Sequence, residues 1–267
     1  MRVTAAALPS TDYDAFARHY DEFTSGSDYE RWTTSVLEHA HGHGFDGRTL
    51  LDLACGTGNS FRPFMERGFE VVGVDASSAM LAEAAHKAPH ARLVLADLRE
   101  LPLLGRFELV TCFDDSLNYL PAEPDLRAAF TGIAANLAPG GLALFDLNTL
   151  KAYRTTFARD VVRDADDGRV FAWRGESSED ARPGCSAGAW IDVFVPASDG
   201  SYRRVRSHHG QRHFPCERVM ALLREAGLEP VTVSGVLDDG ALVADADELR
   251  HLKVLYTARR AKGGAAQ

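Results

Sequence analysis

A glycine-containing turn between an apolar strand and a helix constrains the fold of this chain most. RTLLDLA (48–54) has the length and composition of a buried strand, CGTGN follows it, and SFRPFMERG then shows helical spacing as far as Gly68. FEVVGVDA (69–76) repeats the pattern, because a β-branched run ends in an acid and Ser77 or Ser78 can cap the next helix. These segments together predict a βαβ unit.

The alternation of strand and helix continues along the chain. We expect two short helices within 12–40, strands at 91–98, 106–115 and 141–148, and a helix at 122–138. Repeated strands and helices at this spacing are typical of an α/β fold with a doubly wound, parallel sheet.

The character of the sequence changes after Asn148. Three strand-like stretches separated by Gly, Asp, Ser and Pro predict a small antiparallel insert at about 160–214, and the segment after a helix at 216–227 contains two strands that can close the sheet as a hairpin. We therefore expect three parts: an N-terminal helical segment at 1–46, a core at 47–158 and 215–260, and an antiparallel insert at 159–214. Four aromatic residues of the insert are expected to pack it onto the sheet, with an acceptor platform or a contact in a homo-oligomer as the alternatives: Phe171, Trp173, Trp190 and Phe194.

Composition and charge exclude several classes of protein. The 267 residues hold 29 Lys and Arg against 38 Asp and Glu, which argues against a nucleic-acid partner, since a phosphate-binding surface needs clustered basic residues. No apolar run is long enough for a membrane span, and we expect a soluble, cytoplasmic protein. The four cysteines form no C-x-x-C pair, and one helix face cannot gather His39, His41 and His43, so no metal site is expected.

The distinctive polar residues follow the predicted strands, where an open α/β sheet binds its ligands. Gly56 and Gly58 allow a tight turn that a ligand can approach closely, Asp75 can accept two ribose hydroxyls, and Asp97 can reach an adenine amino group. Asp52 would repel a diphosphate and attract a cationic ligand.

Two departures argue against other nucleotide-binding motifs. Bulky Phe61 stands where the dinucleotide motif G-x-G-x-x-G needs its third glycine, which disfavours an NAD-dependent oxidoreductase, and the chain lacks G-x-x-x-x-G-K-[ST]. The sequence therefore favours a cationic nucleoside as ligand.

The ordered segments resemble the motif series of the class I S-adenosylmethionine-dependent methyltransferases. The segments are LLDLACGTGNS, VVGVDASSAML, LADLRELPL, FELVTCFDDSLNYL and LAPGGLALFDLNTL. The chain is similar to the small-molecule branch that acts on natural products and amino sugars. The resemblance implies a Rossmann-like, mostly parallel sheet of seven strands with an antiparallel insert after the fifth strand, and S-adenosylmethionine as cofactor, with S-adenosylhomocysteine as product.

The same resemblance implies roles for individual residues. Asp52, Ala54, Gly56 and Gly58 would hold the methionine portion, Asp75 and Ala76 the ribose, Met80 the adenine face, Asp97 and Leu98 its amino edge, and Phe113 would border the sulfur. Tyr13 and Tyr20 match positions of a helical lid over the cofactor, and Trp32 would line the methionine end.

The acceptor is expected to be a small molecule, methylated on an amine nitrogen. Alignment of the acceptor with the S–CH3 bond and exclusion of water are the main requirements, and Tyr20 could orient an amine. A hydroxyl or carboxyl acceptor is the alternative; an alcohol would need a general base, for which His208, His209 or His213 are available. Asp114, Asp115, Asn118 and Tyr119 are candidates for contact with the acceptor. A non-catalytic, cofactor-binding subunit is a further alternative.

Overall fold

The computed structural model describes residues 12–261, so the first eleven residues of the helical segment expected at 1–46 lie outside the described part. The chain forms a large sheet in the order β11-β10-β12-β5-β4-β1-β2-β3. Its strands are β1 (Thr49–Leu53), β2 (Glu70–Asp75), β3 (Arg92–Leu95), β4 (Phe107–Cys112), β5 (Leu137–Asn148), β10 (Leu228–Val236), β11 (Leu242–Val243) and β12 (Lys253–Arg260). No helix in this range is long and apolar enough to cross a membrane.

The sheet confirms the predicted α/β, mostly parallel architecture. β1 to β5 are mutually parallel, whereas β12 pairs antiparallel with β5 and with β10, as expected for a closing hairpin. The sheet has eight strands, and the expected seven was wrong by one edge strand. That strand, β11, has only two residues and lies within the acidic loop, where no periodic pattern of side chains can mark it.

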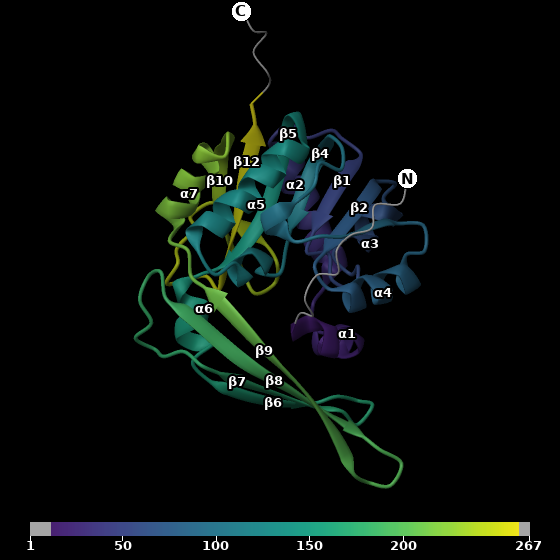
Figure 1. Ribbon diagram of the computed structural model, residues 1–267. Coiled ribbons are helices and arrows are strands. Elements are labelled where there is room, and N and C mark those ends of the chain that lie inside the picture. Colours follow the sequence, from purple (N-terminus) through teal and green to yellow (C-terminus); the bar gives the residue numbers. More distant parts are fainter. Residues whose placement is uncertain (1–11, 262–267) are drawn as a thin grey trace, which may run out of the picture.

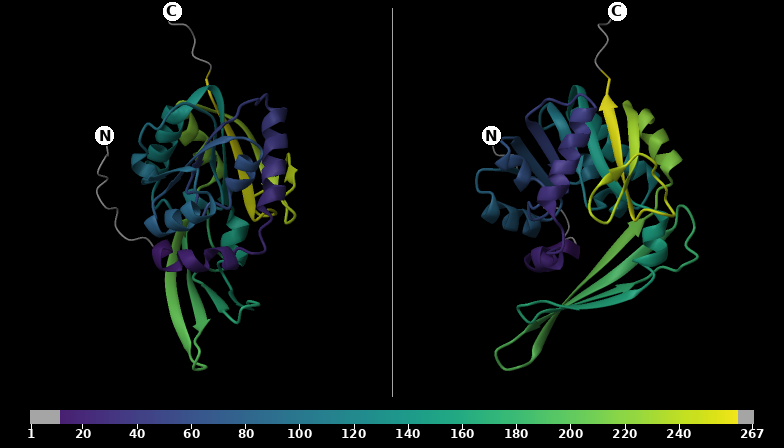
Figure 2. Two further views of the ribbon diagram at one scale, coloured as in Figure 1. Left: turned by 90° about the vertical axis from the view of Figure 1, so that its right-hand side faces the viewer. Right: turned by 180° about the vertical axis from the view of Figure 1, so that it is seen from behind.

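Helices cover both faces of the large sheet. On one face α5 (Glu123–Asn136) and α7 (Cys216–Glu225) bury apolar side chains, and on the other face α2 (Tyr29–Gly42), α3 (Arg62–Glu66) and α4 (Ser78–Lys87) do so. Figure 1 shows α5 and α7 toward the viewer, and Figure 2 shows the opposite face. Burial on both faces explains why the central strands read as continuous apolar runs.

A second, antiparallel sheet projects from the large one (Figure 1). Its strands, in the order β6-β7-β8-β9, are β6 (Asp160–Asp164), β7 (Val170–Gly175), β8 (Ser186–Pro196) and β9 (Tyr202–Arg212), preceded by α6 (Leu150–Thr155). Phe171 and Trp173 lie on the inner face with Ile191 and Val193. They pack there against helical residues such as Phe16 and Tyr153, and not onto the large sheet as expected. Trp190 and Phe194 alternate with Ile191 and Val193 and so lie on the opposite face.

Helix α1 (Asp12–Phe23) lies between the two sheets (Figure 2). On the core side Asp14 accepts a hydrogen bond from the Ser77 hydroxyl at 2.5 Å, and on the insert side Arg163 donates to the Glu22 carbonyl at 2.7 Å. Phe16 is 1% exposed against the insert. The helix is therefore anchored to both parts of the molecule.

The junction of insert and core gives the first prediction, at Gly175. A Cβ on Gly175 would lie 2.1 Å from the Phe157 carbonyl oxygen, so Gly175→Ala forces the two backbone segments apart. We expect it to lower the free energy of unfolding by about 1–3 kcal/mol, measured by urea denaturation. Gly42→Ala is the control, because nothing lies within 4 Å of its Cβ position. Equal stability of the two variants would contradict this account of the junction.

Candidate active site

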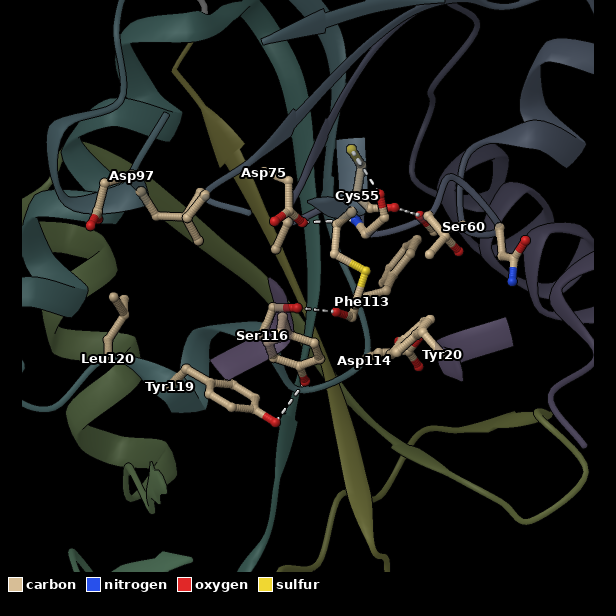
Figure 3. Close-up of a pocket in the computed structure, with 18 of the residues that line it drawn as sticks. Tyr20, Cys55, Ser60, Asp75, Asp97, Phe113, Asp114, Ser116, Tyr119 and Leu120 are labelled. Carbon is tan, nitrogen blue, oxygen red and sulfur yellow. Dashed lines mark hydrogen bonds between the residues drawn. The ribbon is translucent and has the colours of Figure 1, made fainter. Parts of the chain in front are cut away.

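A pocket of about 470 Å³ opens at the carboxyl ends of the parallel strands, where ligands of such sheets bind (Figure 3). We call it the cofactor pocket. Twelve of the predicted site residues line it: Tyr13, Tyr20, Ala54, Gly56, Asp75, Ala76, Met80, Asp97, Leu98, Phe113, Asp114 and Tyr119.

Asp75, at the end of β2, is held in a fixed orientation by backbone groups. Its two carboxylate oxygens accept the N–H groups of Gly56 and Ser77, each at 2.8 Å. Burial raises the pKa of Asp75, and these N–H bonds oppose the shift. Each oxygen retains a lone pair, so the carboxylate can accept a vicinal pair of hydroxyls such as those of a ribose.

The two glycines of the turn serve different purposes. Gly56 has a φ of +52°. A Cβ at this residue would meet no atom closer than the Tyr20 ring at 4.0 Å, so a side chain here would project into the pocket. Gly58 also has a positive φ, of +86°, but a Cβ there would lie 2.9 Å from the Phe61 ring. Gly58 does not line the pocket. It makes room for Phe61, which is fully buried beneath the turn.

Asp52 lies behind the turn, outside the lining of the pocket, and is 1% exposed. Its carboxylate accepts hydrogen bonds from Ser60 and Thr111, each at 2.6 Å. Burial raises the pKa of Asp52 to about 7, although these two hydroxyls lower it. The structure therefore does not present the charge of Asp52 to the ligand, and the expected attraction of a cation must come from other acids.

The end of the cofactor pocket near Asp97 combines a polar group with apolar side chains. Asp97 caps a short 3-10 turn, η1 (Leu98–Glu100), and both its oxygens are bonded by the Arg99 guanidinium, which lowers its pKa. Met80 and Leu98 line the same cavity.

The residues of the cofactor pocket fit a nucleoside with a cationic tail. Asp75 can bind hydroxyls at one point, Asp97 can accept an amino group at another, and Met80, Leu98 and Phe113 supply apolar contact. Arg99 is the only cation among the described lining residues, and Asp97 already neutralises it, so a pyrophosphate would find no free positive charge. This opposes the dinucleotide alternative.

Three aromatic hydroxyl groups close the pocket on the side of α1. Tyr13 donates a hydrogen bond to the Tyr119 hydroxyl at 2.7 Å, and the Tyr13 and Tyr20 rings meet edge to face at 6.1 Å. Burial raises the pKa of Tyr20 well above its ordinary value, so the phenol stays protonated. Trp32 is not part of this lining. It packs edge-on against Phe113 at 5.4 Å and borders a separate cavity.

A second cavity of about 450 Å³ adjoins the cofactor pocket. We call it the acceptor chamber, since it shares four lining residues with the cofactor pocket: Tyr13, Tyr20, Asp114 and Tyr119. Its other walls come from α1, α6, the insert and the loop after β10.

Lys253, Asp114 and Asp115 line the floor of the acceptor chamber, and the buried Asp146 lies beneath them. The Lys253 ammonium lies 2.8 Å from Asp115, 2.9 Å from Asp146 and 3.6 Å from Asp114. Burial opposes the charge of Lys253, but the three carboxylates outweigh it and raise its pKa well above the ordinary value. With three acids against one base, the cluster is negative overall.

Asp114 and Asp115 follow β4 in an unusual backbone conformation. Their φ angles are +55° and +52°, and Asp is among the few non-glycine residues that tolerate this region. Tyr29 donates to Asp114 at 3.0 Å, and Gln211 donates to Asp115. Asp114 is 44% exposed, against 19% for Asp115 and 3% for Asp146, so it is the most accessible of the three aspartates around Lys253.

The structure separates the two neighbouring histidines of β9. His208 lies on the outer face of the insert, bonded to Glu176 at 2.8 Å and stacked on Trp190, and it lines neither the cofactor pocket nor the acceptor chamber. The expected role of His208 as a base therefore has no geometric support. His209 is buried and lines neither cavity, but its Nδ1 lies 3.1 Å from the Tyr119 hydroxyl and its ring packs edge-on against Tyr13 at 4.7 Å.

Asn118 and His213 line neither the cofactor pocket nor the acceptor chamber. The Asn118 amide spans the Arg212 carbonyl and the Asn148 N–H, and so holds the loop after β4 against β5 and β9. His213 is fully buried and accepts the Gly184 N–H at 3.0 Å. No group of three metal-ligating side chains comes together among residues 12–261.

The sequence did not reveal the residues that complete the acceptor chamber. Lys253 begins the last strand, Gln211 ends β9 and Phe16 lies on α1, and none belongs to a local motif. Asp146, near the end of β5, carried the one available signal, which is an acid at the carboxyl end of a parallel strand.

Comparisons with known proteins agree with this geometry. A methyltransferase-domain family model matches residues 50–141. A putative methyltransferase of Bacillus subtilis, YqeM, is 31% identical over 89% of this chain and 94% of its own. An S-adenosylmethionine-dependent methyltransferase from Clostridium acetobutylicum has a TM-score of 0.79 at 25% identity, covering 93% of this chain and 99% of its own. CalS10, an amino pentose methyltransferase from Micromonospora echinaspora, has a TM-score of 0.69 at 25% identity, covering 92% and 96%.

The buried carboxyl group of Asp52 leads to a prediction about how the stability of the protein depends on pH. Between the ordinary carboxyl pKa of about 4 and the raised value of Asp52, the folded protein binds a proton that the unfolded chain releases. The free energy of unfolding of the wild type should therefore fall as pH rises through this range. Asp52→Asn removes this titrating group. The free energy of unfolding of the variant, relative to that of the wild type, should therefore increase with pH, by at most about 1.4 kcal/mol per pH unit. Thermal and urea unfolding between pH 5 and 8 measure it.

Asp97→Asn is the matched control for this series. The pKa of Asp97 is lowered by Arg99, so its contribution to stability is lost only in more acidic solution and stays constant from pH 6 to 8. A difference between Asp52→Asn and wild type that does not vary with pH would show that Asp52 is ionised throughout.

Proposed function

Because this chain belongs to the class I S-adenosylmethionine-dependent methyltransferases, we propose that it transfers the methyl group to an amine nitrogen of a small molecule, either a secondary metabolite or an amino sugar. The observation that carries this proposal is the negative acceptor chamber that opens onto the cofactor pocket. Asp114 and Tyr20 line both cavities, so one carboxylate and one phenol border the place where the two ligands meet.

The residues of the chain then have separate tasks. Asp75 and the Gly56 turn hold the nucleoside, while Tyr20 orients the acceptor through its protonated hydroxyl. S-adenosylmethionine supplies a methyl group whose bond to sulfur breaks as the bond to nitrogen forms, leaving a neutral thioether. An amine that binds as a cation first gives up one proton, which Asp114 can accept and pass to solvent, because only the neutral nitrogen has a lone pair for the attack. The methylated nitrogen then carries the positive charge that the sulfonium loses.

Relatives of known specificity support nitrogen as the methyl acceptor. A Streptomyces venezuelae protein named dTDP-3-amino-3,4,6-trideoxy-alpha-D-glucopyranose N,N-dimethyltransferase is 29% identical over 76% of this chain and 81% of its own. An acidic chamber is also suited to an amine, since amines in water are mostly cationic and are drawn to carboxylates.

We further propose that α1 is the lid of both cavities, within a helical segment at 1–46 that precedes the core. Asp21 supports this proposal, because its carboxylate accepts hydrogen bonds from Lys87 at 2.6 Å, Thr57 at 2.5 Å and Asn59 at 3.0 Å. These contacts fasten the helix over the glycine turn and exclude water from the reacting groups.

Methylation of a hydroxyl is the second candidate, and one observation favours it. Burial lowers the pKa of His209 to about 4, so the ring is a neutral imidazole, and the Tyr119 hydroxyl connects it to Tyr13 and the site. A proton from an alcohol could reach His209 along this chain of hydrogen bonds. An amine acceptor gives its proton to Asp114 and does not need His209.

The test is to locate the transferred methyl group. The full chain is incubated with methyl-labelled S-adenosylmethionine and paired acceptors of one skeleton, an amine and the corresponding alcohol, and the products are identified by mass spectrometry and NMR. We expect the label on nitrogen. Label on oxygen supports the second candidate, and cofactor binding without turnover on either skeleton would support a non-catalytic subunit.

Tyr20→Phe tests the orienting hydroxyl. Loss of one hydrogen bond of about 1–1.5 kcal/mol in the transition state should lower kcat about tenfold, while the affinity for S-adenosylhomocysteine changes little. Tyr202→Phe is the control, because this hydroxyl lies on the exposed end of β9. Unchanged turnover in a folded Tyr20→Phe protein would remove Tyr20 from the mechanism.

A further inference from the structure

We infer that the acceptor is an amine on an apolar body that carries no phosphate, a narrower class that rests on the proposed N-methylation. The inference comes from the composition of the acceptor chamber. Its walls are apolar, the polar groups of its floor are bonded to one another, and it contains no free cation.

The walls of the acceptor chamber are apolar and largely aromatic. They comprise Phe16 and Phe23 of α1, Phe157 after α6, Trp173 of β7, Ile191 of β8 and Leu237 after β10. The one polar atom of Trp173 is already used, since its indole N–H donates to the Thr156 carbonyl at 3.0 Å. A sugar ring with several hydroxyls would find few partners on these walls, whereas an apolar body would be desolvated favourably.

The polar groups of the floor bind one another. The Gln211 amide donates to Asp115, and its oxygen accepts from Asn148 at 2.9 Å. Lys253 is held between Asp115 and Asp146. What remains for a ligand are the exposed carboxylates of Asp114 and Asp238, either of which recognises a cation.

Phosphate recognition would need a free basic group, and the described lining of the acceptor chamber offers none. Its charged residues are Asp114, Asp115, Asp238 and Lys253, and Lys253 is already neutralised. Three basic side chains of α6 and the insert are also engaged. Arg163 donates to the Glu22 and Phe23 carbonyls, Arg169 pairs with Asp167, and Arg154 donates to the Ala181 carbonyl. A nucleoside diphosphate would thus meet repulsion without compensating bonds.

The experiment compares three probes on the full chain saturated with S-adenosylhomocysteine. These are 3-phenylpropylamine, the uncharged 3-phenylpropanol, and a dTDP-linked amino sugar, each titrated by calorimetry. We expect the amine to bind at least about tenfold more tightly than either of the others, because a hydrogen bond to a charged group is worth that factor or more. Tighter binding of the nucleotide sugar, or binding of none of the three, overturns this acceptor class.

Two variants connect the result to the acceptor chamber. Asp114→Asn keeps a residue that tolerates the positive φ, and it should weaken binding of the amine about tenfold and leave that of the alcohol unchanged. Asp239→Asn, an exposed acid outside the acceptor chamber, is its control.

Leu237→Arg adds the missing cation at a site that is 41% exposed, and should improve binding of the nucleotide sugar. Equal loss for amine and alcohol in Asp114→Asn would contradict charge recognition.

Failure of this inference can be distinguished from failure of the proposed function. If the nucleotide sugar binds best and is methylated on nitrogen, the acceptor class is wrong and N-methylation stands. If the alcohol binds as tightly as the amine and receives the methyl group on oxygen, N-methylation itself is wrong.

Discussion

The parallel pairing of β1, β2, β4 and β5 is the constraint on which the rest of the structure depends. Parallel strands end at one edge of the sheet, so the segments that follow them must lie side by side there. That edge brings together the Gly56 turn, Asp75 and the strained pair Asp114 and Asp115. The antiparallel pairing of β12 with β5 then brings Lys253 to the same edge and supplies the one positive charge of the floor.

Local patterns in the sequence were sufficient for the fold and for one end of the site. Asp75 and Gly56 directly follow apolar strands, so their place could be predicted without tertiary information, and the structure puts both in the cofactor pocket. Burial of Asp52 depends on how the turn folds back over it, and that changes its protonation. The position of a residue in a motif therefore does not fix its charge.

The other end of the site depends on pairings that no local pattern encodes. His208 and His209 are adjacent, and only the register of β9 against β8 decides which side chain faces α1. Lys253 meets Asp146 through the pairing of β12 with β5, whereas Gln211 reaches Asp115 only because the insert lies against the core. The shape and charge of the acceptor chamber therefore depend on long-range contacts.

Helix α1 has a consequence for the order of events in a catalytic cycle. Tyr13 and Tyr20 are walls of both cavities, and Phe16 and Phe23 complete the wall around the acceptor. Any movement of α1 that opens the cofactor pocket and releases S-adenosylhomocysteine also opens the acceptor chamber around the methylated product. An amine that receives two methyl groups would thus leave between them and return for the second, and a monomethylated compound would accumulate early in the reaction.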